Sequence, residues 1–336
     1  MGQYMPMKQG LLLINLGTPT SADVSAVRAY LREFLTDKRV IDLPVFLRYL
    51  LVYLVILPFR AKKSAHAYQL IWSDEGSPLL FHSQKVINQI QLKLGSDFKV
   101  VLGMRYATPS ILNALDQLKE CDSITILPLY PQYSSAATGS SIEEVMRILS
   151  QKEVIPSLTV IREFYQHPSY INAQAQMIRN HINENDFLLF SYHGIPERQI
   201  QKSGCKTVCQ ESCPIVSINN QGCYKAQCHQ TSRLLANALN LNENQYKTSF
   251  QSRLGKTPWI KPYTDEVLSE LAEQGVKNLA IVCPSFVTDC LETLEEIGIR
   301  TKEQWLQLGG NKFTLIPCMN DDSDWIDAII DLLKST

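Results

Sequence analysis

Residues 186–196 read Asp-Phe-Leu-Leu-Phe-Ser-Tyr-His-Gly-Ile-Pro and give the clearest structural signal in the chain. The run from Phe187 to Ser191 is apolar or small, as in a strand buried on both faces of a parallel sheet, and Gly194 and Pro196 end it. His193 is therefore expected on the loop that leaves the carboxyl end of a strand. Ligands of open α/β sheets bind at this edge, so His193 is either a functional group or a residue that only caps the strand.

The same pattern occurs near the amino end of the chain. The apolar run 11–16 ends in Gly17-Thr18-Pro19, and a helix is expected after a cap at Ser21 or Asp23. The apolar face of this helix would hold Val24, Val27, Leu31, Phe34 and Leu35. Because no Gly-x-Gly-x-x-Gly pattern opens the helix, a dinucleotide site is not expected.

Two pairs of segments match across the chain. Residues 13–19, Leu-Ile-Asn-Leu-Gly-Thr-Pro, match residues 190–196, and residues 124–128 match residues 280–284. Further strands are expected at 100–103, 158–161 and 279–282, and helices at 109–119 and 168–182. The strand at 158–161 is expected to begin the second half. The sequence therefore predicts two similar α/β halves whose strand ends face a cleft.

Length and composition set the class of protein. A chain of 336 residues is long enough for two domains, and 45% hydrophobic and 19% charged residues are typical of a globular protein. Lys and Arg number 32 against 33 Asp and Glu, which argues against a nucleic-acid partner. The first ten residues hold one lysine and no signal-peptide pattern, so a cytoplasmic location is expected.

A second apolar segment, residues 43–59, is interrupted by a single charge at Arg48. Its unbroken part is too short to cross a bilayer, which takes about 20 apolar residues. The segment is either a buried helix or a surface that lies on a membrane or at the mouth of an apolar pocket. The basic residues Arg60, Lys62 and Lys63 that follow it suit contact with a membrane surface.

Small hydroxyl residues follow the strand at 124–127. They are Ser134, Ser135, Thr138, Ser140 and Ser141, and a helix is expected to begin near Ile142. Hydroxyl and amide groups at a helix start suit an anion such as a carboxylate. Ordinary helix capping explains the same residues equally well.

Four carboxylates follow the strand at 279–282. Asp289, Glu292, Glu295 and Glu296 would share about a third of a helix circumference. A solvated acidic face is the simpler reading, and we expect it for Glu295. Glu292 differs because it follows a strand end at the edge that carries His193. An imidazole and a carboxylate there can hold a divalent metal or move protons from a substrate nitrogen.

Five of the nine cysteines lie between residues 204 and 228. They are Cys205, Cys209, Cys213, Cys223 and Cys228, in a segment whose glycines and proline favour a loop. Without an oxidising compartment, an iron-sulfur or other metal site is favoured over disulfides. Four thiolates suit an iron-sulfur cluster and a structural zinc equally, and the spacing does not separate the two.

Taken together, the motifs of this chain resemble those of the ferrochelatases, which insert ferrous iron into a porphyrin to make haem. The matching segments are Asn-Leu-Gly-Thr-Pro at 15–19, Gly-Ser-Pro at 76–78, Gly-Met-Arg-Tyr at 103–106, Leu-Pro-Leu-Tyr-Pro-Gln-Tyr at 127–133, Ser-Tyr-His-Gly-Ile-Pro at 191–196, Gln-Ser-Arg at 251–253, Pro-Trp at 258–259, Pro-Tyr-Thr-Asp-Glu at 262–266 and Asp-Cys-Leu-Glu-Thr-Leu at 289–294. The resemblance covers nearly the whole chain.

The resemblance implies a fold and a set of roles. It implies two Rossmann-like halves, at 1–155 and 156–310, around a porphyrin cleft, with a carboxyl-terminal helix in 311–336 that packs back on the first half. His193 and Glu292 would be catalytic and would hold the metal, with Asp289 and Glu296 behind Glu292. The porphyrin pocket would be lined by Leu16, Arg105, Tyr106, Tyr130, Ser134, Trp259 and Phe286, with Arg105 able to pair with a propionate.

The partners implied are a porphyrin, taken as protoporphyrin IX, and ferrous iron as substrate. Bacterial members that hold a 2Fe-2S cluster through internal cysteines imply the ligands Cys205, Cys209, Cys213 and Cys223, with Cys228 as the spare. Zinc is the competing metal at these thiols. Two other functions fit the same shape: a carrier of metal or haem without catalysis, and a chelatase for another metal such as cobalt.

Overall fold

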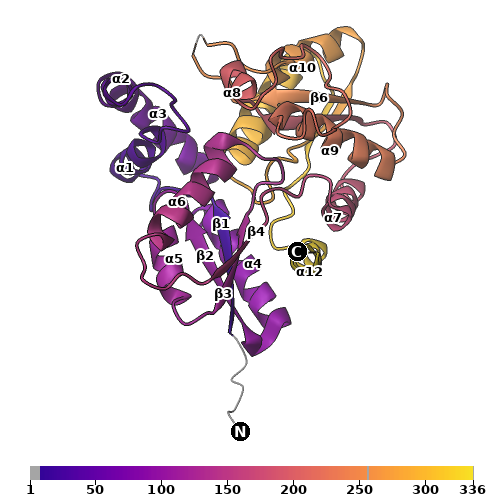
Figure 1. Cartoon of the computed structure of the whole chain (residues 1–336). Coiled ribbons are helices and arrows are strands. Elements are labelled where there is room, and N and C mark those ends of the chain that lie inside the picture. Colours follow the sequence, from indigo (N-terminus) through magenta and orange to yellow (C-terminus); the bar gives the residue numbers. More distant parts are fainter. Residues whose placement is uncertain (1–7, 256, 336) are drawn as a thin grey trace. The chain divides into compact units, whose positions relative to one another are not determined.

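The computed structural model describes residues 8–255 and 257–335, and it contains two compact units (Figure 1). The first unit comprises the chain up to Tyr130, residues 134–163 and the end from Leu333. The second comprises residues 131–133 and 164–332. The expectation that no signal peptide begins the chain falls mostly on residues 1–7, which lie outside the described residues.

The first unit is built on a parallel four-stranded sheet in the order β2-β1-β3-β4. Its strands are β1 (Gln9–Asn15), β2 (Phe98–Met104), β3 (Ser123–Pro128) and β4 (Ser157–Val160). In the central register Leu12 lies opposite Val101 on one side and Ile126 on the other. Because β1 is covered on both faces, all its side chains from Leu11 to Ile14 are buried, as the apolar run predicted.

Helices cover both sheets in the alternating pattern of an α/β fold. Those of the first unit are α1 (Val24–Leu35), α2 (Val45–Leu50), η1 (Leu51–Ile56), α3 (Leu57–Ile71), α4 (Pro78–Leu94), η2 (Gly95–Asp97), α5 (Ile111–Gln117), η3 (Ser135–Gly139) and α6 (Ser140–Leu149). Asp23 caps α1 by accepting the backbone N–H groups of Ser25 and Ala26. Ser110 and Asn113 form a capping box at α5. Both helices begin close to the positions that the sequence predicted.

The second unit repeats the arrangement with a parallel sheet in the order β6-β5-β7-β8. Its elements are α7 (Pro168–Arg179), β5 (Phe187–His193), α8 (Glu197–Lys202), α9 (Tyr224–Ala238), β6 (Tyr246–Gln251), α10 (Thr264–Glu273), β7 (Asn278–Val282), η4 (Glu292–Thr301), α11 (Lys302–Gln307), β8 (Lys312–Leu315) and α12 (Ser323–Lys334). The matched segments fall on β1 and β5, and on β3 and β7, which hold equivalent places in the two sheets. The predicted fold of two similar Rossmann-like halves is confirmed.

Two elements lie elsewhere than the sequence suggested. We expected the strand near 158–161 to begin the second half, but β4 pairs with β3 in the first sheet. This short edge strand is partly exposed, so its pattern carries little information about which sheet it joins. Helix α12 was expected to pack on the first half. Its buried Trp325 stacks on Phe164 at 5.7 Å and meets Tyr170 edge-on at 6.3 Å, and both rings belong to the second unit.

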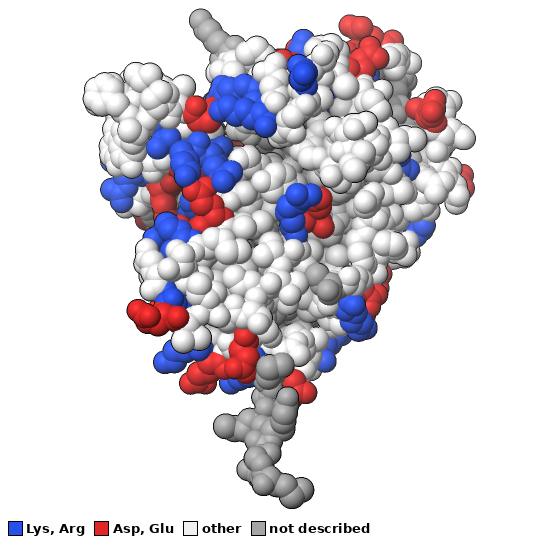
Figure 2. Space-filling model, viewed as in Figure 1, with Lys and Arg blue, Asp and Glu red and all other residues white. Residues whose placement is uncertain are grey.

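The apolar segment 43–59 forms α2, η1 and the start of α3, and the buried-helix alternative for it is wrong. Phe46 is 70% exposed, Leu54 66% and Phe59 79%, whereas Val52 and Leu57 supply the buried face. Figure 2 shows this region of the first unit as an uncharged projection at the upper left. Within the described residues, no helix has the length and apolar character needed to cross a membrane.

Candidate active site

The imidazole of His193 is fixed at the carboxyl end of β5. Its Nδ1 lies 2.6 Å from the carbonyl oxygen of Gly194. Because a carbonyl oxygen only accepts hydrogen bonds, Nδ1 carries the proton of the neutral ring and Nε2 keeps a free lone pair. The backbone is also held, since the His193 N–H donates to Ser285 Oγ at 3.1 Å and the Tyr224 hydroxyl donates to the His193 carbonyl at 2.8 Å. The ring is thus oriented to use Nε2 as a base or a metal ligand.

Aromatic rings stand beside His193. The rings of Trp259 and Phe286, which the family resemblance assigned to the porphyrin pocket, each lie 6.3 Å from the imidazole, centre to centre. Gly194 allows this packing, because a Cβ there would sit 2.8 Å from the Gln251 carbonyl oxygen and 3.3 Å from the Trp259 ring. The second unit therefore brings three of the predicted site residues together.

Two carboxylates from η4 lie near the imidazole. Glu296 accepts hydrogen bonds from the backbone N–H of Ser252 at 2.8 Å and from its hydroxyl at 2.6 Å. Burial raises the pKa of Glu296; Ser252 and the neighbouring His193 oppose this rise, and Glu292 adds to it. His193 and Glu292 are thus close enough to Glu296 to influence its pKa. The segment is a π-helix rather than the expected α-helix, a form that is frequent at functional sites.

Asp289, expected behind Glu292 as a metal ligand, is occupied by internal hydrogen bonds. Its carboxylate is buried and accepts from the Thr293 hydroxyl at 2.9 Å, the Asn320 amide at 2.7 Å and the Cys318 N–H at 3.3 Å. These bonds join the loop at 318–320 to the start of η4. In this arrangement Asp289 supports the segment that carries Glu292.

Glu295 differs from its prediction. We expected a solvated acidic face, but Glu295 is only 8% exposed and both its carboxylate oxygens accept from Arg300 Nε at 2.9 and 3.0 Å. The prediction is wrong because Glu295 is buried within the π-helical segment and Arg300 neutralises it. The acidic groups left for chemistry are therefore Glu292 and Glu296.

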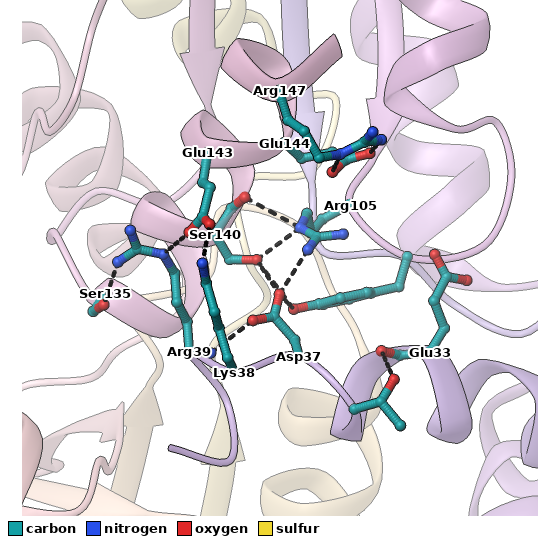
Figure 3. Close-up of polar contacts among 12 residues, drawn as sticks. Glu33, Asp37, Lys38, Arg39, Arg105, Ser135, Ser140, Glu143, Glu144 and Arg147 are labelled. Atoms are coloured by element: carbon teal, nitrogen blue, oxygen red, sulfur yellow. Dashed lines mark hydrogen bonds and ion pairs between the residues drawn. The ribbon is translucent and has the colours of Figure 1, made fainter. Parts of the chain in front are cut away.

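In the first unit, Arg105 is already engaged with protein groups (Figure 3). Its Nη2 donates to Asp37 Oδ2 at 2.6 Å and its Nε to Ser140 Oγ at 2.7 Å. The buried Tyr106 donates to the same Asp37 oxygen at 2.9 Å. Burial raises the pKa of Tyr106, and the charge of Asp37 raises it further. A propionate at Arg105 would therefore have to share the guanidinium with Asp37.

The other predicted pocket residues of the first unit lie at its strand ends. Leu16 is half-buried directly after β1, and Tyr130 follows β3. Ser134 caps η3, because its hydroxyl accepts the Ala137 N–H at 3.1 Å, so the capping alternative holds for this residue.

Several residues that shape the site were not singled out by the sequence. Ser252 adopts a positive φ of 67°, which aims both of its donors at Glu296. Gln251 donates its amide to the Glu292 carbonyl at 3.0 Å and ties the end of β6 to η4. Asp37 organises the Arg105 cluster. Only the match of 251–253 to a family motif pointed to the first two, and it gave them no role.

The cysteine loop holds its thiols close together. A hydrogen bond with Cys213 and backbone N–H groups of Ala226 and Lys225 lower the pKa of Cys223 to about 6, and Cys205 contributes a further hydrogen bond. The shared hydrogen bond raises the pKa of Cys213, and burial adds to the rise. All nine cysteines of the chain are free thiols.

No metal geometry is preformed at this loop. Among residues 8–255 and 257–335, no three His, Cys, Asp or Glu side chains converge to hold an ion. The thiols are hydrogen-bonded to one another, which is a different arrangement from four sulfurs placed around a metal. The loop therefore supplies the donor atoms of a thiolate centre, but these atoms are not arranged in a metal-binding geometry. Cys228, the expected spare, is fully buried, and burial raises its pKa.

The two-unit α/β architecture is shared with a solved protein. The solved structure of SirB from Bacillus subtilis with Fe³⁺ superposes with a TM-score of 0.57 at 11% sequence identity, covering 98% of this chain and 95% of that one. This likeness concerns the fold.

Sequence comparison gives the family. The family model Ferrochelatase matches residues 8–336. The ferrochelatase of Legionella pneumophila is 62% identical over 96% of this chain and 98% of its own length. The ferrochelatase of Coxiella burnetii is 51% identical over 98% of this chain and 94% of its own length. The chain belongs to the ferrochelatase family.

Proposed function

We propose that this protein inserts ferrous iron into protoporphyrin IX, releasing two protons and forming protohaem in the last step of haem synthesis. Family membership supports the reaction class. The observation that carries the proposal in the structure is the imidazole of His193, whose Nδ1–H is held by Gly194 while Nε2 stays available near Glu292 and Glu296.

Metallation replaces two pyrrole N–H protons by a divalent ion, so the enzyme needs a proton acceptor and a group that delivers the metal. His193 Nε2 serves as the acceptor or as an iron ligand. The hydrogen bond from Nδ1 to the Gly194 carbonyl supports either role, because it fixes the tautomer and orients the ring.

Glu292 and Glu296 form the proposed acidic path for iron or protons, with Asp289 next along the chain. Carboxylates draw a divalent cation from water and exchange it readily. The two donors of Ser252 hold Glu296 in position. The three hydrogen bonds on Asp289 favour a supporting role for that residue over direct contact with iron.

The porphyrin is proposed to bind at the strand ends of the two halves. The pocket set is Leu16, Arg105, Tyr106, Tyr130, Ser134, Trp259 and Phe286. The rings of Trp259 and Phe286 beside His193 support an apolar, planar ligand on the second half. Tyr106 is fully buried and acts through Asp37 and Arg105 rather than by direct contact.

A turnover assay tests this function. Purified protein, ferrous iron and porphyrin are mixed under anaerobic conditions, with protoporphyrin and coproporphyrin in parallel. Loss of the free-base spectrum over many turnovers is expected, faster with protoporphyrin. A carrier of metal or haem would stop at one equivalent per chain. Preferential use of cobalt when both metals are limiting would favour the cobalt chelatase instead.

The resident cofactor we propose is a 2Fe-2S cluster on Cys205, Cys209, Cys213 and Cys223, with zinc as its rival. The lowered pKa of Cys223 and the contacts among the thiols support a thiolate centre here. When bound, the cluster would order a loop that is rich in polar residues and has little core of its own. The iron that enters the porphyrin is substrate and is separate from this centre.

We further propose a cytoplasmic protein that touches the membrane surface through residues 43–59. The exposed apolar residues of α2 and η1 and the neighbouring Arg60, Lys62 and Lys63 support docking on anionic lipid. A hydrophobic porphyrin that partitions into lipid would then be collected there.

A further inference from the structure

Lys225 is a lysine buried inside the cysteine loop. Its side chain is 0% exposed, although it stands in the first turn of α9. The ammonium group donates to the carbonyl oxygen of Cys209 and, at 3.3 Å, to that of Gln210. It also lies 5.8 Å from the centre of the Phe250 ring. A lysine this deeply buried is rare unless an anion accompanies it.

Cysteine sulfurs of the same loop are candidates for that anion. Burial lowers the pKa of Lys225, and the thiols of Cys213, Cys209 and Cys223 oppose this shift more strongly than the carboxylate of Glu197 does. Within the described part of the chain, no carboxylate forms an ion pair with Lys225. The buried positive charge is therefore matched to sulfur.

The start of α9 adds to this positive field. Cys223 is the N-cap residue of the helix and therefore stands at the positive end of the helix dipole. The backbone N–H groups of Ala226 and Lys225 are among the causes that lower its pKa. Further along α9, Arg233 holds the loop by donating to the carbonyls of Cys213 at 3.0 Å and Pro214 at 3.2 Å. Arg233 is partly exposed, whereas Lys225 is buried inside the cysteine loop. Of these two basic residues, Lys225 is therefore the one shielded from solvent beside the cysteines.

We propose that Lys225 is the counter-cation of the metal–thiolate centre on Cys205, Cys209, Cys213 and Cys223 and that it sets the reduction potential of that centre. The inference rests on the proposed 2Fe-2S cluster. Four thiolates give such a cluster a net negative charge, and reduction adds one electron to it. A fixed positive charge beside the sulfurs stabilises the reduced form more than the oxidised form, and so raises the potential.

Two substitutions separate the charge of Lys225 from its hydrogen bonds. Lys225→Gln keeps donors for the carbonyls of Cys209 and Gln210 but removes the charge, whereas Lys225→Arg keeps the charge. Lys247→Gln is the matched control, since Lys247 pairs with Glu270 on the same unit, away from the thiols. The proteins are purified anaerobically, iron and acid-labile sulfide are measured, and the cluster is titrated reductively by its visible and paramagnetic resonance spectra.

We expect Lys225→Gln to lower the reduced-to-oxidised ratio at a fixed ambient potential by tenfold or more, which is at least 59 mV for one electron. Lys225→Arg and Lys247→Gln should stay close to wild type. A fully loaded Lys225→Gln protein with the wild-type potential would overturn the inference. If Lys225→Gln loses the cluster, retention in Lys225→Arg supports the role of the charge, and equal loss in both overturns it. Wild-type protein without iron and sulfide would refute the cluster itself, which is a separate result from an unchanged potential.

Discussion

Ser252 gives both of its donors to one carboxylate, that of Glu296, with its backbone N–H at 2.8 Å and its hydroxyl at 2.6 Å. The positive φ of 67° at Ser252 makes this possible, because it turns the N–H and the side chain in the same direction at the end of β6. Glu296 in turn lies within electrostatic reach of His193 and Glu292. The position of one acidic group at the site therefore depends on a strained serine.

The first prediction concerns this serine. Ser252→Gly and Ser252→Ala both remove the hydroxyl, but glycine accepts the positive φ and alanine does not. Since a hydrogen bond to a charged group contributes about 1.5–3 kcal/mol, we expect both variants to lose roughly tenfold or more in kcat/KM for iron, with porphyrin binding unchanged. Normal activity in the glycine variant and a loss only in the alanine variant would show that backbone geometry matters and the hydroxyl does not.

The second prediction separates Glu292 from the pocket wall. Glu292→Gln keeps the size of the side chain and removes its charge, so turnover should fall by about a hundredfold while porphyrin affinity changes little. Steady-state kinetics together with porphyrin binding followed by fluorescence make the comparison. Glu303→Gln, an exposed carboxylate on α11, is the control. A variant that turns over normally but binds porphyrin poorly would assign Glu292 to the pocket.

The third prediction concerns Asp289, for which the structure indicates a supporting role. Removing its carboxylate in Asp289→Ala leaves the donors of Thr293, Asn320 and Cys318 without their acceptor in a buried site. We expect a loss of about 1–3 kcal/mol in the free energy of unfolding, measured by denaturant titration. Unchanged stability with strongly weakened iron use would instead make Asp289 a metal ligand.

The sequence was most informative where burial is extreme. The central strands β1 and β5 were predicted because every position from Leu11 to Ile14 and from Leu188 to Tyr192 is buried, which requires an unbroken apolar or small run. Gly194 and Pro196, which follow the second of these strands, predicted that His193 lies at the carboxyl end of β5. The edge strand β4, half exposed and four residues long, gave no such signal and was assigned to the wrong half.

The details of the site depend on backbone geometry that residue types do not encode locally. The π-helix η4 turns Glu295 into a buried partner of Arg300, although its spacing suggested a solvated face. The positive φ of Ser252 arises from tertiary packing. So does the ion pair between Arg105 and Asp37. Likewise, the apolar sequence at 43–59 is compatible with a buried helix and with an exposed apolar surface. The structure shows that Val52 and Leu57 are buried and that much of the rest of the segment is exposed.

The fourth prediction tests the exposed apolar surface. Leu50→Ser with Leu54→Ser should reduce flotation with anionic vesicles, because both leucines are exposed, Leu54 at 66%, and their loss removes little core. Leu92→Ser on α4 is the control, since Leu92 is 82% exposed outside this surface. Flotation that is the same in the double variant, the control and the wild type would remove the membrane proposal, provided all three are folded by circular dichroism.

The fifth prediction concerns the thiols. Protein purified anaerobically should contain iron and acid-labile sulfide, and Ser in place of Cys205, Cys209, Cys213 or Cys223 should lower cluster content, stability and activity together. Cys228→Ser should do much less, because Cys228 is buried in α9 as an ordinary core thiol. Stoichiometric zinc without sulfide would replace the cluster by zinc on the same ligands. Active, colourless and metal-free protein would refute the centre altogether.

The most direct test of the account is the anaerobic turnover rate of His193→Ala with ferrous iron and protoporphyrin. His193 is the last residue of β5 and is only half-buried, so the variant should fold, which circular dichroism and the unfolding transition verify. Because Nε2 is the proposed proton acceptor or iron ligand, the rate should fall by at least about a hundredfold. A folded His193→Ala protein that works within a few-fold of wild type would contradict the assignment of His193 as the catalytic group.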